Sequence, residues 1–289
     1  MNLRIIIRKI KRRIVKNIVS DYFQPYIDEI NNRMDCLEYR YETEQIYALN
    51  LIKYPVKIHF INMISKGNVG DYNSGVYQYF SSYFSEYKCY FHNLLGIQWK
   101  LIQKGDYIII GGGGLLNHCN EWNRVIRNLQ KYTEHIIIWG AGENLHNDES
   151  CSELLDLSTF SIVGTRDKTN YFVPCPSCML PQLSFSYSIE RKFGVVEHKY
   201  FPIAEFEYDK IDNCVDIYTI IKFIGSSEVI ISNSYHAIYW ATLMKKKVII
   251  YEKWSSKFDN LKWQQNVYSG NLDLDVMKCK IYRCIIRKP

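Results

Sequence analysis

Several features that would place this 289-residue chain in a common class are missing from it. No apolar run approaches the ~20 residues that a membrane-spanning helix needs. Cys175 and Cys178 form a C-x-x-C pair, but neither a second pair nor a histidine set accompanies it, so a zinc or redox site is poorly supported. We find no signal-peptide pattern ahead of the nine cysteines, and we therefore expect reduced thiols in a cytoplasmic protein.

An excess of one charge sign is also missing from most of the chain. The formal net charge is +6, but residues 1–16 hold seven basic residues and no acidic one, which leaves 29 basic against 30 acidic residues elsewhere. A nearly neutral body argues against a broad nucleic-acid surface, and we expect no nucleic-acid partner. The hydrophobic share of 47% supplies ample core material.

The basic N-terminal segment has the pattern of an amphipathic helix over residues 3–19, with apolar residues at three- and four-residue steps. This pattern is typical of a helix on an anionic membrane surface, and equally of a helix docked on a partner subunit or on its own body. A mitochondrial presequence is a third possibility, although no serine precedes Ser20. Residues 28–51 predict a second helix, so residues 1–54 form a helical extension.

The most distinctive stretch is DYIIIGGGGLL, residues 106–116. Three consecutive isoleucines predict a strand buried on both faces, and the glycines after them allow backbone to approach a ligand or another backbone closely. We expect a helix over residues 115–130, whose N-terminal amides would face an anion near Gly112 and Gly113. The spacing differs from G-x-G-x-x-G, so a nicotinamide site is disfavoured, and a glycine turn that serves only packing remains an alternative.

Three further strand-and-turn units surround this stretch. A strand at 56–62 leads to GNVGD and a helix at 74–84, and a second short strand is expected at 89–92. The strands at 136–139 and 160–163 end in GAGE and GTRD. Each polar residue in these turns has a structural and a functional interpretation: Asn68 and Asp71 cap a helix or bind a polyhydroxylated substrate, Glu143 does likewise, and Arg166 pairs with Asp167 or binds an anion.

A second unit follows the prolines at 174, 176 and 181. Strands are predicted at 194–200, 228–232 and 247–251, and helices at 216–225 and 237–244. His236 falls in the turn Asn233-Ser234-Tyr235-His236 between a strand and a helix, which favours a functional histidine over one buried in a core. The tail from residue 257 is expected to be helical. We place domains at 55–185 and 186–289.

The ordered motifs GNVGD, DYIIIGGGGLL, IIIWGAGE, FSIVGTRD, FVPCPSCMLP and VIISNSYHAIYWATLMKKKVII resemble the polysaccharide pyruvyl transferase family over roughly residues 56–262. The resemblance implies an α/β fold of two Rossmann-like domains in a GT-B-like arrangement. It also implies transfer of the carboxyvinyl unit of phosphoenolpyruvate onto a sugar, as a ketal that bridges two hydroxyls. No cofactor and no metal are implied.

The resemblance assigns roles to individual residues. His236 matches the family's active-site histidine and Arg166 an arginine that faces the donor, and we expect both to be catalytic. The remaining positions of the expected substrate site are Asn68, Gly70, Asp71, Gly112, Gly113, Glu143, Asn233, Ser234, Tyr235 and Lys257. In one departure, Ser234 stands where many members have arginine, which removes a fixed cation, and Lys257 is a candidate to compensate.

These residues predict a transferase of surface-polysaccharide biosynthesis, such as that of capsule or exopolysaccharide. The expected partners are phosphoenolpyruvate, a lipid-linked or polymeric sugar acceptor, and an anionic membrane surface that residues 1–20 contact. The expected location is the cytoplasm, peripherally at the inner face of the plasma membrane. Two alternatives are a GT-B-like glycosyltransferase that uses a sugar nucleotide and a non-catalytic membrane-surface scaffold.

Overall fold

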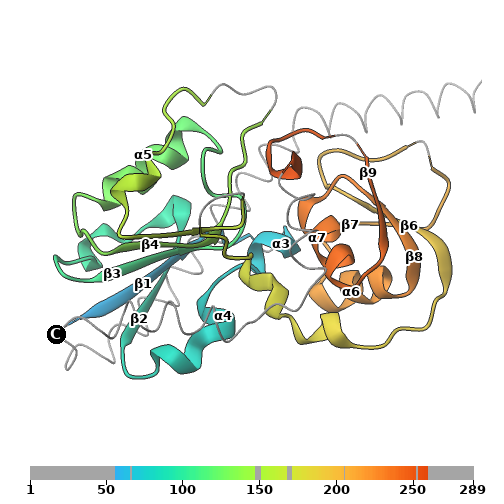
Figure 1. The fold of residues 1–289 in the computed structure, drawn as a ribbon, viewed down its shortest axis with the longest axis horizontal. Coiled ribbons are helices and arrows are strands. Elements are labelled where there is room, and N and C mark those ends of the chain that lie inside the picture. Colours follow the sequence, from blue (N-terminus) through green and yellow to red (C-terminus); the bar gives the residue numbers. More distant parts are fainter. Residues whose placement is uncertain are drawn as a thin grey trace, which may run out of the picture.

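The computed structural model describes residues 56–65, 67–146, 151–167, 171–204, 206–251 and 253–259. These residues form two fully parallel sheets that lie side by side in Figure 1. The predicted helices at 3–19 and 28–51, and nearly all of the predicted C-terminal helix, lie outside the described residues. The mixed α/β class with parallel strands is confirmed.

The first sheet has five strands in the order β2-β1-β3-β4-β5. Its central strands are the isoleucine-rich segments, and they are buried on both faces as a parallel sheet requires. The bounds are β1 Lys57–Asn62, β2 Lys88–Asn93, β3 Tyr107–Gly111, β4 Ile136–Ala141 and β5 Ile162–Thr165.

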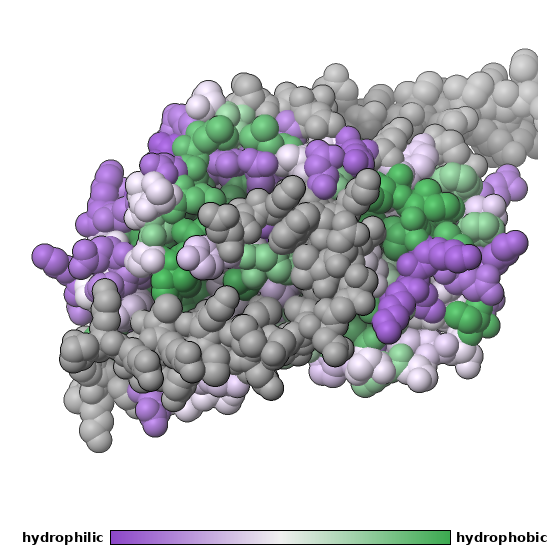
Figure 2. Space-filling model, viewed as in Figure 1, coloured by the Kyte–Doolittle hydropathy of each residue, from purple (hydrophilic) through white to green (hydrophobic). Residues whose placement is uncertain are grey.

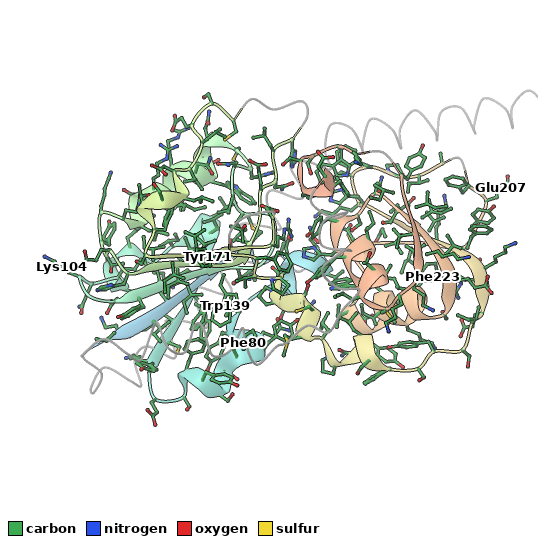
Figure 3. All side chains as sticks on the ribbon, viewed as in Figure 1. Phe80, Lys104, Trp139, Tyr171, Glu207 and Phe223 are labelled. Carbon is green, nitrogen blue, oxygen red and sulfur yellow. The ribbon has the colours of Figure 1, made fainter. Side chains whose placement is uncertain are left out.

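Helices cover the two faces of this sheet. Ile108 and Ile110 pack with Ile126 and Leu129 of α5 (Asn120–Leu129) on one face. Alternate strand residues face the other side, where α4 (Tyr77–Phe80) and the 3-10 helix η2 (Ser81–Phe84) cover them. Figure 3 labels Phe80 and Trp139, whose ring centroids lie 4.9 Å apart on that side.

The second sheet has four strands in the order β7-β6-β8-β9. Helices α6 and α7 pack together against it and supply most of its core, including the fully buried Trp240. The bounds are β6 Arg191–Glu197, β7 Lys210–Asp212, α6 Ile217–Gly225, β8 Ser227–Ser232, α7 Tyr235–Leu243 and β9 Lys247–Ile250. The expected strands and helices of this half are present within a few residues, and β7 is an addition.

Two predicted helices of the first half are present over only part of their expected ranges. The helix expected at 115–130 begins only at Asn120, because Leu116 continues in extended form and pairs with Glu143. The helix expected at 74–84 starts only at Tyr77 and is divided into α4 and η2. A short helix that was not predicted, α3 (Val69–Tyr72), precedes it and ends at Asn73, whose side chain donates to the carbonyl of Val69.

Short 3-10 turns complete the connections: η3 Leu94–Gly96, η4 Trp99–Leu101, η5 Leu157–Thr159, η6 Pro176–Met179 and η7 Pro181–Ser184. The predicted domain boundary at 185/186 falls between η7 and β6. The surface seen in Figure 2 mixes hydrophilic residues with hydrophobic patches on both halves. Scattered apolar side chains of this kind are ordinary on a protein surface.

Both sheets reverse their strand order once. The chain runs from β1 to β2 on one side and then places β3 on the other side of β1; in the second sheet β6 lies between β7 and β8. Ligands of open parallel sheets bind beyond the carboxyl ends of the strands at such a reversal. The two reversal points therefore mark where a site is expected.

Candidate active site

One cavity of about 410 Å³ is lined from both sheets. Its walls are loops and helix starts that follow the carboxyl ends of strands in each sheet, which agrees with the position of the two reversal points. The first sheet contributes Met63, Ser65, Asn68, Asp71, Gly114, Leu115, His118, Trp122, Asn144, His146 and Arg166. The second contributes His198, Lys199, Tyr200, Phe201, Asn213, Ser234, Tyr235, His236, Trp254 and Lys257.

Arg166 follows β5 directly, and its side chain is 1% exposed. None of its three guanidinium nitrogens has a hydrogen-bond partner within the described part of the chain. The guanidinium carbon lies 3.8 Å from the centroid of the Tyr235 ring, a cation–π contact. A guanidinium cannot deprotonate, so burial without an acceptor is costly unless an anion completes the site.

The imidazole of His236 lies in the first turn of α7 and is 7% exposed. Only glycine fits at position 70, because a Cβ there would collide with the imidazole. Burial lowers the pKa of His236 well below its usual value, and the charges of Arg166 and Lys257 lower it further. The ring is therefore neutral at pH 7 in the empty cavity.

A chain of polar groups lies behind His236. The indole nitrogen of Trp240 donates to Ser177 Oγ (3.1 Å), which lies 3.4 Å from Cys175 Sγ. Cys175 Sγ lies in turn 3.8 Å from His236 Nε2. Since an indole N–H only donates, the chain runs toward the imidazole when Ser177 donates to Cys175 and the thiol donates to Nε2. In that arrangement the neutral ring carries its proton on Nδ1.

Lys257 and Asp71, which both line the cavity, interact electrostatically. Burial lowers the pKa of Lys257 to about 7, with Arg166 acting in the same direction and Asp71 against it. Burial raises the pKa of Asp71, against the pull of Lys257, Arg166 and Lys199. Asp71 Oδ2 accepts from Asn68 Nδ2 at 2.7 Å. The charge states of Lys257 and Asp71 are therefore expected to respond to an anionic ligand.

The first turn of α7 also faces the cavity. Ser234 is its N-cap residue, and the serine side chain makes no capping hydrogen bond. Uncapped N-terminal amides favour an anion. The helix that was expected to face an anion after the glycines starts too late to do so, and α7 takes its place.

Seven of the residues expected at the site line this cavity: Asn68, Asp71, Arg166, Ser234, Tyr235, His236 and Lys257. The other five are not among its lining residues. Gly70 packs against the imidazole of His236, as described above. Gly112, at φ +72°, leaves no room for a Cβ beside the carbonyl of Ser74, and Gly113 faces the hydroxyl of the same serine.

The last two of these five residues make structural contacts. Glu143 Oε1 accepts from Asn117 at 3.2 Å. The amide of Asn233 bridges backbone groups, accepting from His198 N at 2.7 Å and donating to Phe201 O at 2.7 Å. Asn233 thus holds a loop that does line the cavity.

Sequence reasoning missed a group of rings along the same cavity. They are His118, Trp122, His146, His198, Phe201 and Trp254, and they come from four separate segments of the chain. No spacing in the sequence connects these segments. The glycine at 114 was a weak signal, because a Cβ there would lie 2.9 Å from Cβ of the cavity residue Asn144.

Residues 68–252 match the family model described as "Polysaccharide pyruvyl transferase". The chain belongs to the polysaccharide pyruvyl transferase family. Its members are transferases of polysaccharide biosynthesis, and the match includes every strand except β1. A pyruvyl transferase of this family acts on a sugar acceptor, so the shared cavity is the place to seek its substrates.

A solved structure of a functionally uncharacterised protein from Klebsiella pneumoniae is similar to this chain at 15% identity and a TM-score of 0.44. The alignment covers 77% of this chain and 92% of that one. No curated protein matches. Among the described residues, no helix is both long and apolar enough to cross a membrane.

Proposed function

We propose that the protein transfers the pyruvyl unit of phosphoenolpyruvate to a sugar of a surface-polysaccharide precursor, forming a pyruvate ketal and releasing phosphate. The observation that carries this proposal is the buried Arg166 guanidinium, which lacks a hydrogen-bond acceptor in the described chain and lines the same cavity as His236. Arginine binds planar carboxylates and phosphates through two parallel hydrogen bonds. Phosphoenolpyruvate offers both groups on a three-carbon frame.

The remaining positive charge of the cavity suits a trianionic donor. Lys257 and Lys199 line it, and the uncapped start of α7 adds amide donors. Ser234 removes the fixed cation that many family members have two residues before the histidine. We propose that Lys257 and the α7 amides supply the lost stabilisation of the leaving phosphate.

The transfer balances as follows. A proton adds to the methylene carbon of the enol phosphate, which becomes a methyl group, and the adjacent carbon becomes electron-poor. The oxygen of one sugar hydroxyl attacks that carbon and loses its proton. The carbon–oxygen bond to phosphate then breaks, a second hydroxyl closes the ring, and its proton leaves with the phosphate. One donor and one diol give one ketal and one inorganic phosphate.

His236 is the proposed acid for the first step. Its pKa is low in the empty cavity because of burial and the nearby Arg166 and Lys257 charges. Donor anions that bind these two cations cancel part of that effect, and the imidazole then gains its proton where it is needed. We therefore expect proton uptake when phosphoenolpyruvate binds.

We propose that the two sheets belong to two Rossmann-like domains, 55–185 and 186–289, in a GT-B-like arrangement with donor and acceptor between them. Residues 1–20, outside the described range, would hold the enzyme at an anionic leaflet beside a lipid-linked acceptor. Deleting them should abolish liposome binding and preserve turnover of a soluble acceptor.

A ligand-binding test separates this reaction from the sugar-nucleotide alternative. Phosphoenolpyruvate at 100 times its Kd should stabilise the protein by about 2.7 kcal/mol in thermal unfolding, and UDP-glucose or GDP-mannose should not. Arg166→Gln should abolish the stabilisation. Arg124→Gln on the exposed side of α5 is the matched control and should retain it. Stabilisation by nucleotide sugars alone would refute the proposal.

Turnover provides the second test. With phosphoenolpyruvate and an accepted glycan, the wild type should release phosphate and add a pyruvyl group that mass spectrometry detects on the glycan. His236→Gln should lower the rate at least a hundredfold, because it removes the proton donor. Undiminished phosphate release by this variant would show that another group is the acid. Membership of a transferase family already argues against the non-catalytic scaffold.

A further inference from the structure

Two chemically different groups of residues line the cavity. One group is ionisable and consists of Asp71, Arg166, His236 and Lys257, and the other is a group of rings. The ring of His118 lies tilted by 51° against Trp122 of α5, with centroids 4.1 Å apart, and meets His146 edge-on at 4.6 Å. His146 then meets Trp254 at 5.0 Å. These four rings form a continuous wall, called the aromatic wall below, between the first sheet and the segment after β9.

Asn144 supplies a directional polar group beside this wall. It is 8% exposed and lines the cavity, and its Oδ1 atom is buried with no hydrogen-bond partner among the residues that the structure describes. Its Nδ2 lies 3.2 Å from His118 Nδ1, and its backbone N–H donates to Leu116 O at 2.9 Å. The amide is therefore held in place, while its oxygen has capacity for a donor from a ligand.

His118 of the aromatic wall carries no charge at neutral pH. Burial, with smaller effects from His146 and Lys257, lowers the pKa of His118 to about 4. Burial also lowers the pKa of the nearby His198 to about 3, with Lys257, Lys199 and His146 acting in the same direction. Two cations also line the cavity. Lys257 Nζ lies 3.6 Å from the centroid of the Trp254 ring, and Lys199 is the second. A bound trianionic donor would compete for both.

We propose that Asn144 and the aromatic wall form the acceptor subsite, and that they bind an uncharged pyranose whose hydroxyl donates to Asn144 Oδ1. This inference rests on the proposed function, since it names the sugar class for that reaction. Aromatic faces bind the C–H face of a pyranose, and the unsatisfied Asn144 Oδ1 selects for a hydroxyl. A sugar carboxylate here would be repelled by the donor's own negative charges.

Turnover with two acceptor series tests the sugar class. The full-length protein is given saturating phosphoenolpyruvate and the 4-nitrophenyl glycosides of glucose, galactose and mannose, or those of glucuronic and galacturonic acid. Phosphate release should occur with at least one neutral hexoside at a kcat/KM at least tenfold above that of any uronide. Preference for a uronide would overturn the inference.

Variants test the residues. Asn144→Ala should raise the acceptor KM about tenfold or more and leave the KM of phosphoenolpyruvate within twofold, because one hydrogen bond to the acceptor is lost. Trp122→Ala should do the same, and Trp122→Phe should recover part of the loss. Asn128→Ala is the matched control: Asn128 lies on α5 but is not among the lining residues, and neither KM should change. Unchanged acceptor KM in both Asn144→Ala and Trp122→Ala would refute the assignment.

A binding measurement keeps this inference separate from the proposed reaction. Saturation-transfer NMR on the full chain without donor should detect a neutral hexoside, and Asn144→Ala should reduce the signal at least threefold. Sugar binding of this kind without any phosphate release would reject the pyruvyl transfer and retain the subsite. Phosphate release with neither hexoside binding nor an effect of Asn144→Ala would retain the reaction and reject the subsite.

Discussion

At the scale of single residues, the burial of Arg166 is the most informative feature. Its guanidinium contacts the Tyr235 ring and, within the ranges that the structure describes, no hydrogen-bond acceptor, although it is almost completely removed from water. Gly142 permits this, because a Cβ there would collide with the arginine side chain. The empty protein therefore holds a charge that costs stability and that a bound anion would satisfy.

Replacing Arg166 should increase stability and remove donor binding. Arg166→Met keeps the length of the side chain and removes the buried charge, so we expect the free energy of unfolding to increase by roughly 1 to 3 kcal/mol. Chemical denaturation without ligand measures this increase. The same variant should show no stabilisation by phosphoenolpyruvate. A destabilised variant would indicate that the guanidinium has a structural role.

Cys175 should affect the proton transfer without contacting substrate. Cys175→Ser keeps a hydroxyl at the position of the thiol and should retain kcat within about threefold, whereas Cys175→Ala should lower it about tenfold. Cys175→Asp would place a carboxylate beside His236 Nε2 and raise the histidine's pKa. Because the acid form is the active one, the falling limb of the kcat profile should move to higher pH. If the falling limb of the kcat profile stayed at the same pH in Cys175→Asp, the contact between Cys175 and His236 Nε2 would be contradicted.

At the scale of elements, strands were predictable and loops were not. The isoleucine runs of β3 and β4 predict buried parallel strands because no other arrangement covers them on both faces. The late start of α5 was not predictable, since it depends on the pairing of Leu116 with Glu143, 27 residues further on. Arg166 and His236 were found because they directly follow predicted strands. The aromatic wall was missed because tertiary packing alone brings its members together.

A buried chain of side chains joins β1, β2 and the loop before β3. Gln98 N donates to His92 Nδ1 (3.2 Å), so His92 Nε2 donates to His59 Nδ1 (2.9 Å) and His59 Nε2 donates to Asp106 (3.1 Å). Every nitrogen of both rings is used, and both rings must be neutral. Burial, and to a lesser extent His59, lowers the pKa of His92 to about 3.

These hydrogen-bonded histidines should make the free energy of unfolding depend on pH. A histidine whose folded pKa is depressed adds stability that is complete above about pH 6.5 and is lost as the pH falls toward 3. For His92 alone, the free energy of unfolding should decrease by about 2 kcal/mol between pH 7.5 and pH 5. Urea unfolding at both pH values measures this change. His92→Asn should show a smaller decrease, and an equal one would contradict the assignment.

At the scale of the whole molecule, the cavity depends on contacts between the two sheets. Val69 N donates to Asn213 O at 3.0 Å, and Leu145 exchanges two hydrogen bonds with Ser256. Both contacts lie beside the cavity and connect segments far apart in the sequence. They bring Lys257 of one half near Asp71 of the other, and no single motif predicts that these two residues meet.

The Lys257–Asp71 pair should make donor binding weaken at alkaline pH. Lys257 has a pKa of about 7 in the empty site, and a trianion binds its protonated form. The Kd of phosphoenolpyruvate should therefore increase by up to tenfold per unit above pH 7. The donor's phosphate does not add to this trend, because its last ionisation lies near pH 6. Calorimetry from pH 7 to 9 measures the Kd, and Lys257→Arg should give a nearly constant value.

The cavity takes its walls from several different loops. Arg166 and His236 follow β5 and β8, whereas Trp122, Asn144 and His146 belong to the connections after β3 and β4. Loops can change in length and sequence while the strands that carry them stay constant. Descendants of one ancestral enzyme could thus come to decorate different glycans through changes in two connections, and keep the same three-carbon reagent throughout.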